Sequence, residues 1–251
     1  MAERPSPTAS RRITPIGERP ASSRPRGDGG TVIAVYGSRA DVGVAAVATA
    51  LALAFQSLGM GDVGLAELDP RLAARTRAGV IRPGASNDNG SEHVSDATDA
   101  IAIPGTDAAL VKRQDGVWTL AMPRPRTTAI SDAKSVIMTV DAMRERFPVS
   151  VAALGHQVNE RTLAAFDTAD RIVVITDGAV PSVRGTQRVL RLCRRLNYPD
   201  EKMCVVVNRF DAPGSLAVTD ISAALRREVY WKIPAGPVPD VAGLAARLLD
   251  R

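Results

Sequence analysis

Cysteine and histidine are scarce in this chain, which has two of each among 251 residues. The spacing of Cys193 and Cys204 matches neither a disulfide framework nor a zinc site. His93 and His156 stand far apart in sequence, and neither belongs to a recognisable arrangement of nucleophile and base. The sequence therefore predicts a protein of a reducing compartment, the cytoplasm, with no catalytic histidine.

Long apolar runs are also missing. No run approaches the roughly 20 residues that a membrane-spanning helix needs, and the N-terminal residues contain no apolar core of a signal peptide. We expect neither secretion nor a membrane span. Hydrophobic residues nevertheless make up 45% of the chain, which is enough to bury a sizeable core.

The first segment, residues 1–30, is basic and rich in Pro, Ser and Gly. It has six arginines against three carboxylates and few aliphatic residues. Such a composition cannot bury enough apolar surface to offset the entropy of ordering, so we expect a disordered tail. A basic tail of this kind suits contact with nucleic acid, acidic lipid or an acidic partner, while a solubilising leader is the simpler interpretation.

From Thr31 onward, short apolar runs alternate with segments of helical periodicity. Repeated strand–helix units of this kind predict a doubly wound, mainly parallel α/β sheet of about seven strands, with helices on both faces. We expect one domain over 31–251, interrupted by a polar, turn-rich surface excursion at 75–108. The expected strands are 31–36, 63–68, 116–122, 149–154, 171–176, 203–207 and 229–233. The expected helices are 44–58, 131–146, 160–168, 182–197 and 219–227.

The first strand-to-helix turn is the predicted phosphate site, because free backbone N–H groups converge there in a doubly wound sheet. Its residues are Gly37, Ser38, Arg39, Ala40, Asp41, Val42, Gly43, Val44, Ala45 and Ala46. This turn resembles the phosphate loop of the ParA/MinD family of P-loop ATPases, whose pattern is K-G-G-V-G-K-[ST]-[ST].

Several side chains of that pattern are replaced in this chain. Arg39 stands for the signature lysine, and Ala40 and Asp41 stand for two glycines. Val42 and Gly43 match. Val44 replaces the P-loop lysine, while Ala45 and Ala46 replace the two hydroxyl residues.

These replacements have direct electrostatic consequences. Without a lysine at Val44, the β- and γ-phosphates lack their usual cation, and without a hydroxyl at Ala45 a magnesium ligand is lost. Asp41 would add like-charge repulsion on the order of 1 kcal/mol against a triphosphate, which Arg39 would offset in part. The loop thus keeps the position of a phosphate site after the first strand, without the lysine and hydroxyl side chains that bind phosphate and magnesium.

The resemblance extends over about residues 31–235. Glu67-Leu-Asp-Pro-Arg71 resembles the family's D-x-D-P segment, which implies for Asp69 the role of positioning water and the magnesium shell. The Walker B aspartate falls on Ala153, so the resemblance implies that this metal-organising carboxylate is lost. Asn208 and Arg209 match the family's N-R pair, whose asparagine reads adenine.

Two segments are most similar to the CpaE/TadZ branch, which serves the assembly and localisation of Flp/Tad pili. Residues 110–123 resemble that branch's L-x-x-x-x-x-G-L-x-V-L-P-A-P segment, and residues 169–177 resemble its A-D-x-V-x-L-V-T-[ED]. This branch tolerates degenerate phosphate loops. The resemblance implies partners among the components of a pilus or secretion assembly.

Arginines recur at helical spacing on the predicted helix 182–197 and form a basic stripe: Arg184, Arg188, Arg191 and Arg195. Such a stripe can neutralise DNA phosphates without base contacts, or it can be an ordinary solvated helix face. The amphipathic segment from Val241 to Leu249 resembles in outline the membrane-targeting helix of MinD, although packing on the domain is the simpler interpretation.

Three hypotheses follow. The first is a pseudo-ATPase, similar to CpaE/TadZ, that localises or assembles a surface machine such as a pilus through homodimerisation and protein partners. It would bind ATP or ADP only passively, without magnesium, in the cytoplasm, at the inner face of the membrane or at a cell pole. The second is a weak ATPase that uses Arg39, Asp69 and backbone amides. The third is a DNA-associated partition protein.

Overall fold

A computed structural model of the chain describes residues 29–69, 100–103, 109–113, 115–121 and 132–250. The predicted tail at 1–30 therefore lies outside the described residues except for Gly29 and Gly30. Most of the predicted excursion at 75–108 lies outside them too, and neither prediction is tested.

The described strands form one nine-stranded sheet in the order β3-β4-β5-β2-β6-β1-β7-β8-β9. All neighbours from β5 to β9 in this order are parallel, whereas β3, β4 and β5 pair antiparallel at one edge. The strands are β1 (Thr31–Gly37), β2 (Val63–Glu67), β3 (Ala100–Ala102), β4 (Ala109–Lys112), β5 (Val117–Ala121), β6 (Val149–Ala153), β7 (Arg171–Thr176), β8 (Met203–Asn208) and β9 (Trp231–Ile233).

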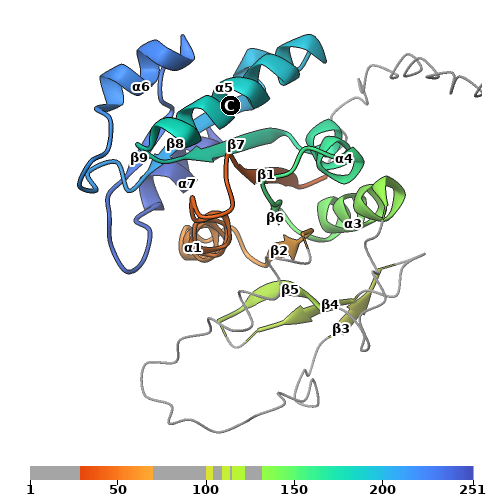
Figure 1. Cartoon of the computed structure of the whole chain (residues 1–251). Helices are drawn as coiled ribbons and strands as arrows, with labels where there is room; N and C mark the ends of the chain where they lie inside the picture. The colour runs from red at the N-terminus through yellow and green to blue at the C-terminus, as the bar shows by residue number, and fades with distance from the viewer. Residues whose placement is uncertain (1–28, 70–99, 104–108, 114, 122–131, 251) are drawn as a thin grey trace, which may run out of the picture.

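Helices cover both faces of this sheet (Figure 1). Helices α1 and α7 pack on one face, and α3, α4, α5 and α6 pack on the other. The helices are α1 (Val44–Ser57), α3 (Ala133–Arg146), α4 (Glu160–Thr168), α5 (Val180–Arg195), α6 (Val218–Leu225) and α7 (Ala242–Leu249), with a 3-10 turn at Asp200–Lys202.

Strand β1 is the centre of the core. Its side chains alternate between the two faces, since successive residues of a strand point to opposite sides. Val32, Ala34 and Tyr36 pack under α3, α4 and α5, whereas Ile33 and Val35 pack under α1 and α7. All five are at most 3% exposed. The uninterrupted apolar run from Val32 to Tyr36 is explained by burial on both faces.

The predicted fold class is confirmed, and the sheet has two more strands than expected. The additional strands are β3 and β4, which are only three and four residues long. Such short antiparallel edge strands leave little periodicity in the sequence, so the sequence could not separate them from the surrounding polar residues. The fold thus contains the predicted parallel core and an antiparallel extension at its β2 side.

The C-terminal helix α7 packs on the domain. Leu244, Ala245 and Leu248 are buried in the same core as α1 and β1. Among the described residues, no helix is long and apolar enough to cross a membrane. The apolar face that resembles a membrane-targeting helix is therefore used for internal packing.

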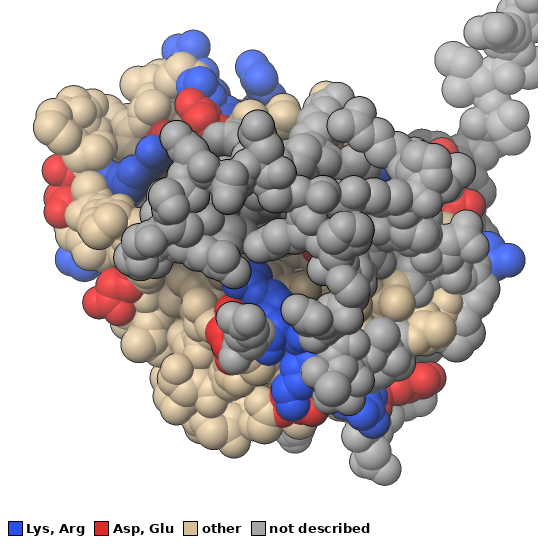
Figure 2. All heavy atoms as spheres, turned by 90° about the horizontal axis from the view of Figure 1, so that it is seen from below, with Lys and Arg blue, Asp and Glu red and all other residues tan. Residues whose placement is uncertain are grey.

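The exposed charges are mixed in sign on the face seen in Figure 2, where Lys and Arg side chains lie beside Asp and Glu among the described residues. On the β2–β5 part of the sheet, Lys112 pairs with Asp62 at 3.2 Å and Arg113 pairs with Asp115 at 2.9 Å. These pairs are partly or largely exposed, and pairs of this kind contribute little to stability.

One arginine joins the start of β1 to two helices. Arg144 of α3 donates to Asp170 and to the Gly30 carbonyl through Nη1, and to the Thr168 carbonyl through Nη2. Asp170 also accepts the backbone N–H of Val32 at 2.8 Å. The side chains of Arg144 and Asp170 are about three-quarters buried. Because charge-assisted bonds in such a setting are among the stronger ones, this cluster fixes where β1 begins.

Replacing Arg144 by methionine should lower the free energy of unfolding by about 2–3 kcal/mol, because three acceptors lose a charged donor and Asp170 keeps an uncompensated charge. Arg146→Met is the matched control on the same helix, since Arg146 is exposed, and it should change stability by less than about 0.5 kcal/mol. Urea denaturation of both variants measures the difference. Equal effects would show that the cluster at Arg144 does not stabilise the fold.

Candidate phosphate-loop site

The loop after β1 lies at the carboxyl edge of the parallel strands, between β6 and β7. The N–H of Ser38 donates to the Ile175 carbonyl of β7 at 2.9 Å, and the N–H of Gly37 donates to the Gly155 carbonyl at 3.3 Å. The chain leaves β1 toward β2 through α1, whereas it leaves β7 in the opposite direction through α5. Ligands of doubly wound sheets bind at such a switch point, so the predicted loop lies at the expected place.

Two valines of the loop point into the core. Val42 is fully buried and Val44 is 3% exposed, and both belong to the cluster formed by α1, α7 and one face of the sheet. Val44 opens α1 at the position that the resemblance assigns to the P-loop lysine. The side chain at this position is therefore part of the packing under α1 and offers no cation to a phosphate.

The carbonyl groups of the loop are bound by the segment that follows β8. Asn208 donates through Nδ2 to the Val42 carbonyl at 2.9 Å, and Asn208 is only 6% exposed. Arg209 donates through Nη2 to the Asp41 carbonyl at 2.8 Å. The predicted adenine reader and its neighbour thus hold the loop in place. Whether Asn208 also contacts a base stays a prediction.

The charges of the loop are paired on its surface. Arg39 lies 3.3 Å from the carboxylate of Asp41, and the side chains are 42% and 60% exposed. An ion pair in this setting contributes roughly 0–1 kcal/mol. Arg209 also lies 3.5 Å from Asp177 at the end of β7. Asp41 therefore has a cation beside it, but it still places a carboxylate on the loop.

The backbone amides at the start of α1 are donors of the kind that suits an anion. The first N–H groups of any helix lack intrahelical acceptors. The N-cap of α1 is Gly43, in the left-handed region with φ 94°, and it has no side chain that could accept a hydrogen bond from these N–H groups. Ala45 is half-buried and Ala46 is exposed in this first turn. The donors present at the start of α1 are therefore backbone groups, without a lysine or a hydroxyl beside them.

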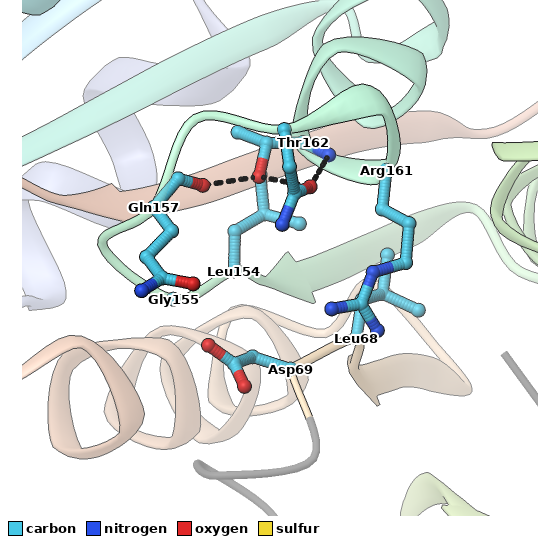
Figure 3. Close-up of a pocket in the computed structure, with 8 residues that line it drawn as sticks. Leu68, Asp69, Leu154, Gly155, Gln157, Arg161 and Thr162 are labelled. Carbon is cyan, nitrogen blue, oxygen red and sulfur yellow. Dashed lines mark hydrogen bonds between the residues drawn. The ribbon is translucent and has the colours of Figure 1, made fainter. Parts of the chain in front are cut away.

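Asp69 follows β2 and faces the segment after β6 that contains Gly155 and Gln157 (Figure 3). Its carboxylate packs against Gly155, where an added Cβ would collide with it, and the Gly155 carbonyl accepts the N–H of Gly37. Gln157 and Arg161 line the same small cavity, which holds about 10 Å³. This is about the space of one water molecule, so Asp69 faces a confined polar site.

The last residue of β6 is Ala153, which is fully buried and pairs in register with Glu67 of β2. The structure places no carboxylate at this position. Among the described residues, no group of three or more His, Cys, Asp and Glu side chains lies together as a metal site. A magnesium–triphosphate group needs a lysine, a hydroxyl and a carboxylate that Val44, Ala45 and Ala153 do not supply, so the described residues do not fit it.

The arginine stripe lies on the outer face of α5. Arg184, Arg188, Arg191 and Arg195 are all exposed, as the helical spacing predicted. The helix reaches the phosphate loop at its first turns, because a Cβ at Gly185 would lie 2.8 Å from the Ser38 carbonyl. Among the described residues, the buried hydroxyl oxygens of Ser38 and Ser182 find no hydrogen-bond partner. The stripe itself runs away from the loop along α5.

Sequence reasoning missed three neighbours of the loop and of Asp69. Asp177 bonds the N–H of Ala179 and lies beside Arg209. Gln157 and Arg161 line the cavity at Asp69. Asp177 is part of the segment 169–177 that resembles the pilus branch, and this resemblance is the only sequence feature that could have pointed to it. Gln157 and Arg161 follow β6 without any motif, so only the fold brings them to the site.

A pair of glycine variants tests the contact between the loop and Asn208. Gly43 and Gly59 both have positive φ, 94° and 76°, but an added Cβ at Gly43 would lie 2.6 Å from Asn208 Nδ2, whereas at Gly59 it would meet nothing within 4 Å. Gly59→Ala should cost about 1 kcal/mol of stability from backbone strain alone. Gly43→Ala should cost about 2–3 kcal/mol, because the hydrogen bond to Val42 is also disturbed.

Thermal or urea unfolding measures both variants. The double variant Gly43→Ala/Asn208→Ala should lose less stability than the sum of the losses in the two single variants, because both substitutions disturb the same contact. Strict additivity, or equal costs at Gly43 and Gly59, would rule out Asn208 as the residue that holds the loop.

Comparison with known proteins identifies the fold. No protein-family model matches the sequence, and no curated protein matches it. Solved structures do match. The septum site-determining protein MinD of Pyrococcus horikoshii, complexed with Mg-ADP, superposes with a TM-score of 0.61 at 12% identity over 88% of this chain and 96% of that one.

A ParA family ATPase from Chlorobium tepidum superposes with a TM-score of 0.58 at 13% identity, over 84% of this chain and 86% of that one. MinD in the MinC:MinD cell division complex of Aquifex aeolicus superposes with a TM-score of 0.57 at 18% identity, over 86% and 85%. Identities this low establish the architecture alone. The chain has the α/β fold of the ParA and MinD ATPases.

Proposed function

We propose that this protein is a degenerate ParA/MinD-like protein that has given up ATP hydrolysis and acts through homodimerisation and partner binding. Its role is to localise or assemble a cell-surface machine such as a Flp/Tad pilus. It works in the cytoplasm, at the inner face of the membrane or at a cell pole, and it binds ATP or ADP passively, without magnesium.

The observation that carries this proposal is the burial of apolar side chains at the catalytic positions. Val44 packs under α1 and Ala153 is fully buried at the end of β6. Restoring one group would not restore the site, because a lysine at Val44 would have to leave the core packing and a carboxylate at Ala153 would be buried. The loss of three groups on two elements, α1 and β6, favours the loss of hydrolysis over a single compensated substitution.

Passive nucleotide binding is supported by what the loop keeps. The N–H groups at the start of α1 suit an anion, and the P. horikoshii MinD of the same fold is complexed with Mg-ADP. The loop would have to hold phosphate with backbone donors and Arg39, against the charge of Asp41. We expect weak binding that does not depend on magnesium.

Partner binding and the pilus role rest on similarity. The MinD of A. aeolicus is part of a complex with MinC, which supports protein partners for this fold. The similarity to the pilus branch lies in residues 110–123 and 169–177, parts of which form β4, β5 and β7. In the encoding organism, deletion of the gene should abolish surface pili, and the Asp69→Ala variant should restore them if hydrolysis is not needed.

An ATP turnover assay with and without magnesium tests the loss of chemistry. We expect turnover no higher than in a buffer control, and the same nucleotide dissociation constant within about twofold with or without magnesium. Asp220→Ala on α6, an exposed carboxylate, is the matched control for Asp69→Ala. Turnover that disappears in Asp69→Ala but not in Asp220→Ala would overturn the proposal in favour of a weak ATPase.

A DNA-associated role is the second candidate, supported by the exposure of all four arginines of the stripe. Non-specific binding of this kind rests on phosphate neutralisation and falls steeply with salt. Replacing Arg188 and Arg191 by alanine should then lower affinity for a duplex at least tenfold at about 50 mM salt. Salt-dependent retention that these two substitutions abolish would favour partitioning over the pilus role.

A further inference from the structure

A second positively charged site lies at the amino edge of the sheet, away from the phosphate loop. The C-terminal end of α5, the turn before β8 and the end of α6 meet there and enclose a surface pocket of about 160 Å³. Helices α5 and α6 lie side by side over this part of the sheet (Figure 1), where Gln187 donates to the Ala224 carbonyl at 2.7 Å. The pocket is much larger than the roughly 10–15 Å³ that one water molecule occupies.

Six of the described residues line the pocket, and three of these are arginines: Arg194, Arg226 and Arg227. The only carboxylate among these six residues is Asp200. Arg227 lies 3.0 Å from Asp200 and also donates to its carbonyl group. Asp200 is 74% exposed, so its charge is largely screened by solvent. The pocket therefore has a net positive charge, and Arg227 is already held in a fixed position.

The other two arginines have no such partner. Within the described part of the chain, neither the Arg194 nor the Arg226 side chain makes a hydrogen bond or an ion pair. The pocket floor is apolar, formed by Leu190 and Leu225, each 3% exposed. Guanidinium groups above an apolar floor bind oxyanions well, because the floor excludes water from one side of the contact.

The backbone at Arg226 supports a role for its side chain. Arg226 ends α6 in the left-handed region with φ 50°, where glycine is the usual residue. A non-glycine residue in this conformation is strained, and such strain gathers at functional positions. Glycine would be the more stable choice at this helix end, yet the chain has an arginine that reaches the pocket.

We propose that this pocket binds a compact phosphate group, held by Arg194 and Arg226 with Arg227 as a fixed third donor. The concave shape favours a small phosphate monoester over a nucleic-acid backbone, which would lie across the exposed stripe of α5. The site is independent of the phosphate loop and of the function proposed above. A failure of either proposal leaves the other standing.

Equilibrium dialysis with inorganic phosphate at low ionic strength is the primary test, and glucose 6-phosphate serves as a monoester. We expect saturable binding of about one phosphate per chain. The double substitution Arg194→Gln/Arg226→Asn should weaken it at least tenfold. The matched control is Arg191→Gln/Arg195→Gln, which removes the same charge from the stripe on the same helix and should change the affinity by less than threefold.

Two further variants separate the sites and the causes. Arg39→Gln removes the cation of the phosphate loop, so any phosphate binding that it lowers is assigned to the loop, whereas binding that is lost only in Arg194→Gln/Arg226→Asn is assigned to the pocket. Arg226→Gly relieves the backbone strain, so its melting temperature should equal or exceed that of the parent while its phosphate affinity falls. This combination distinguishes a lost ligand contact from a damaged fold.

Three results would overturn the proposal. The first is no saturable phosphate binding up to about 10 mM. The second is equal loss in the pocket and stripe double variants, which would indicate general charge attraction, and the third is loss only with Arg39→Gln. A short DNA duplex that binds in a pocket-dependent way, when phosphate and glucose 6-phosphate do not, would assign the pocket to nucleic acid instead.

Discussion

Burial of β1 on both faces is the constraint on which the rest of the structure depends. Because its side chains alternate between two cores, the strand has a single register against β6 and β7, and the loop that follows it can leave the sheet at only one place. The Arg144 cluster fixes where the strand begins, and the bonds from Ser38 to β7 and from Gly37 to Gly155 fix where it ends. Asp69, Asn208 and Asp177 reach the loop because their own strands end at the same edge.

The loop is held by groups that do not require a nucleotide. In a nucleotide-binding loop, the lysine and the hydroxyls point toward phosphate, whereas here Val42 and Val44 point into the core and Asn208 and Arg209 bind the loop carbonyls. The core packing of the two valines and these hydrogen bonds, all of them contacts within the domain, therefore stabilise the conformation of the loop.

The sequence could predict the elements whose periodicity is strong. The parallel strands and the helices α1, α3, α4, α5 and α6 appear close to their expected residues, and α7 lies in the amphipathic segment from Val241 to Leu249. Strand β9 has only three residues, but it lies within the strand predicted at 229–233. Strands β3 and β4 are similarly short and were not predicted, because they lie in or beside the turn-rich stretch 75–108, where no periodicity persists. The partners of the site were harder still. Arg161 is distant in sequence from Asp69, and Arg227 is distant in sequence from Asp200. Only the crossover connections of the fold bring the two residues of each pair together.

The tight packing of glycines around the loop bears on how relatives of this chain can be recognised. Gly155 leaves no room for a side chain beside Asp69, and Gly185 leaves none beside the Ser38 carbonyl. The requirement at Gly185 comes from the Ser38 backbone and would persist after every phosphate-binding side chain had changed, whereas the requirement at Gly155 comes from the side chain of Asp69. A search pattern built on the lysine and hydroxyls of the loop would pass over such proteins, whereas one built on the spacing of Gly37 and Gly185 would retain them.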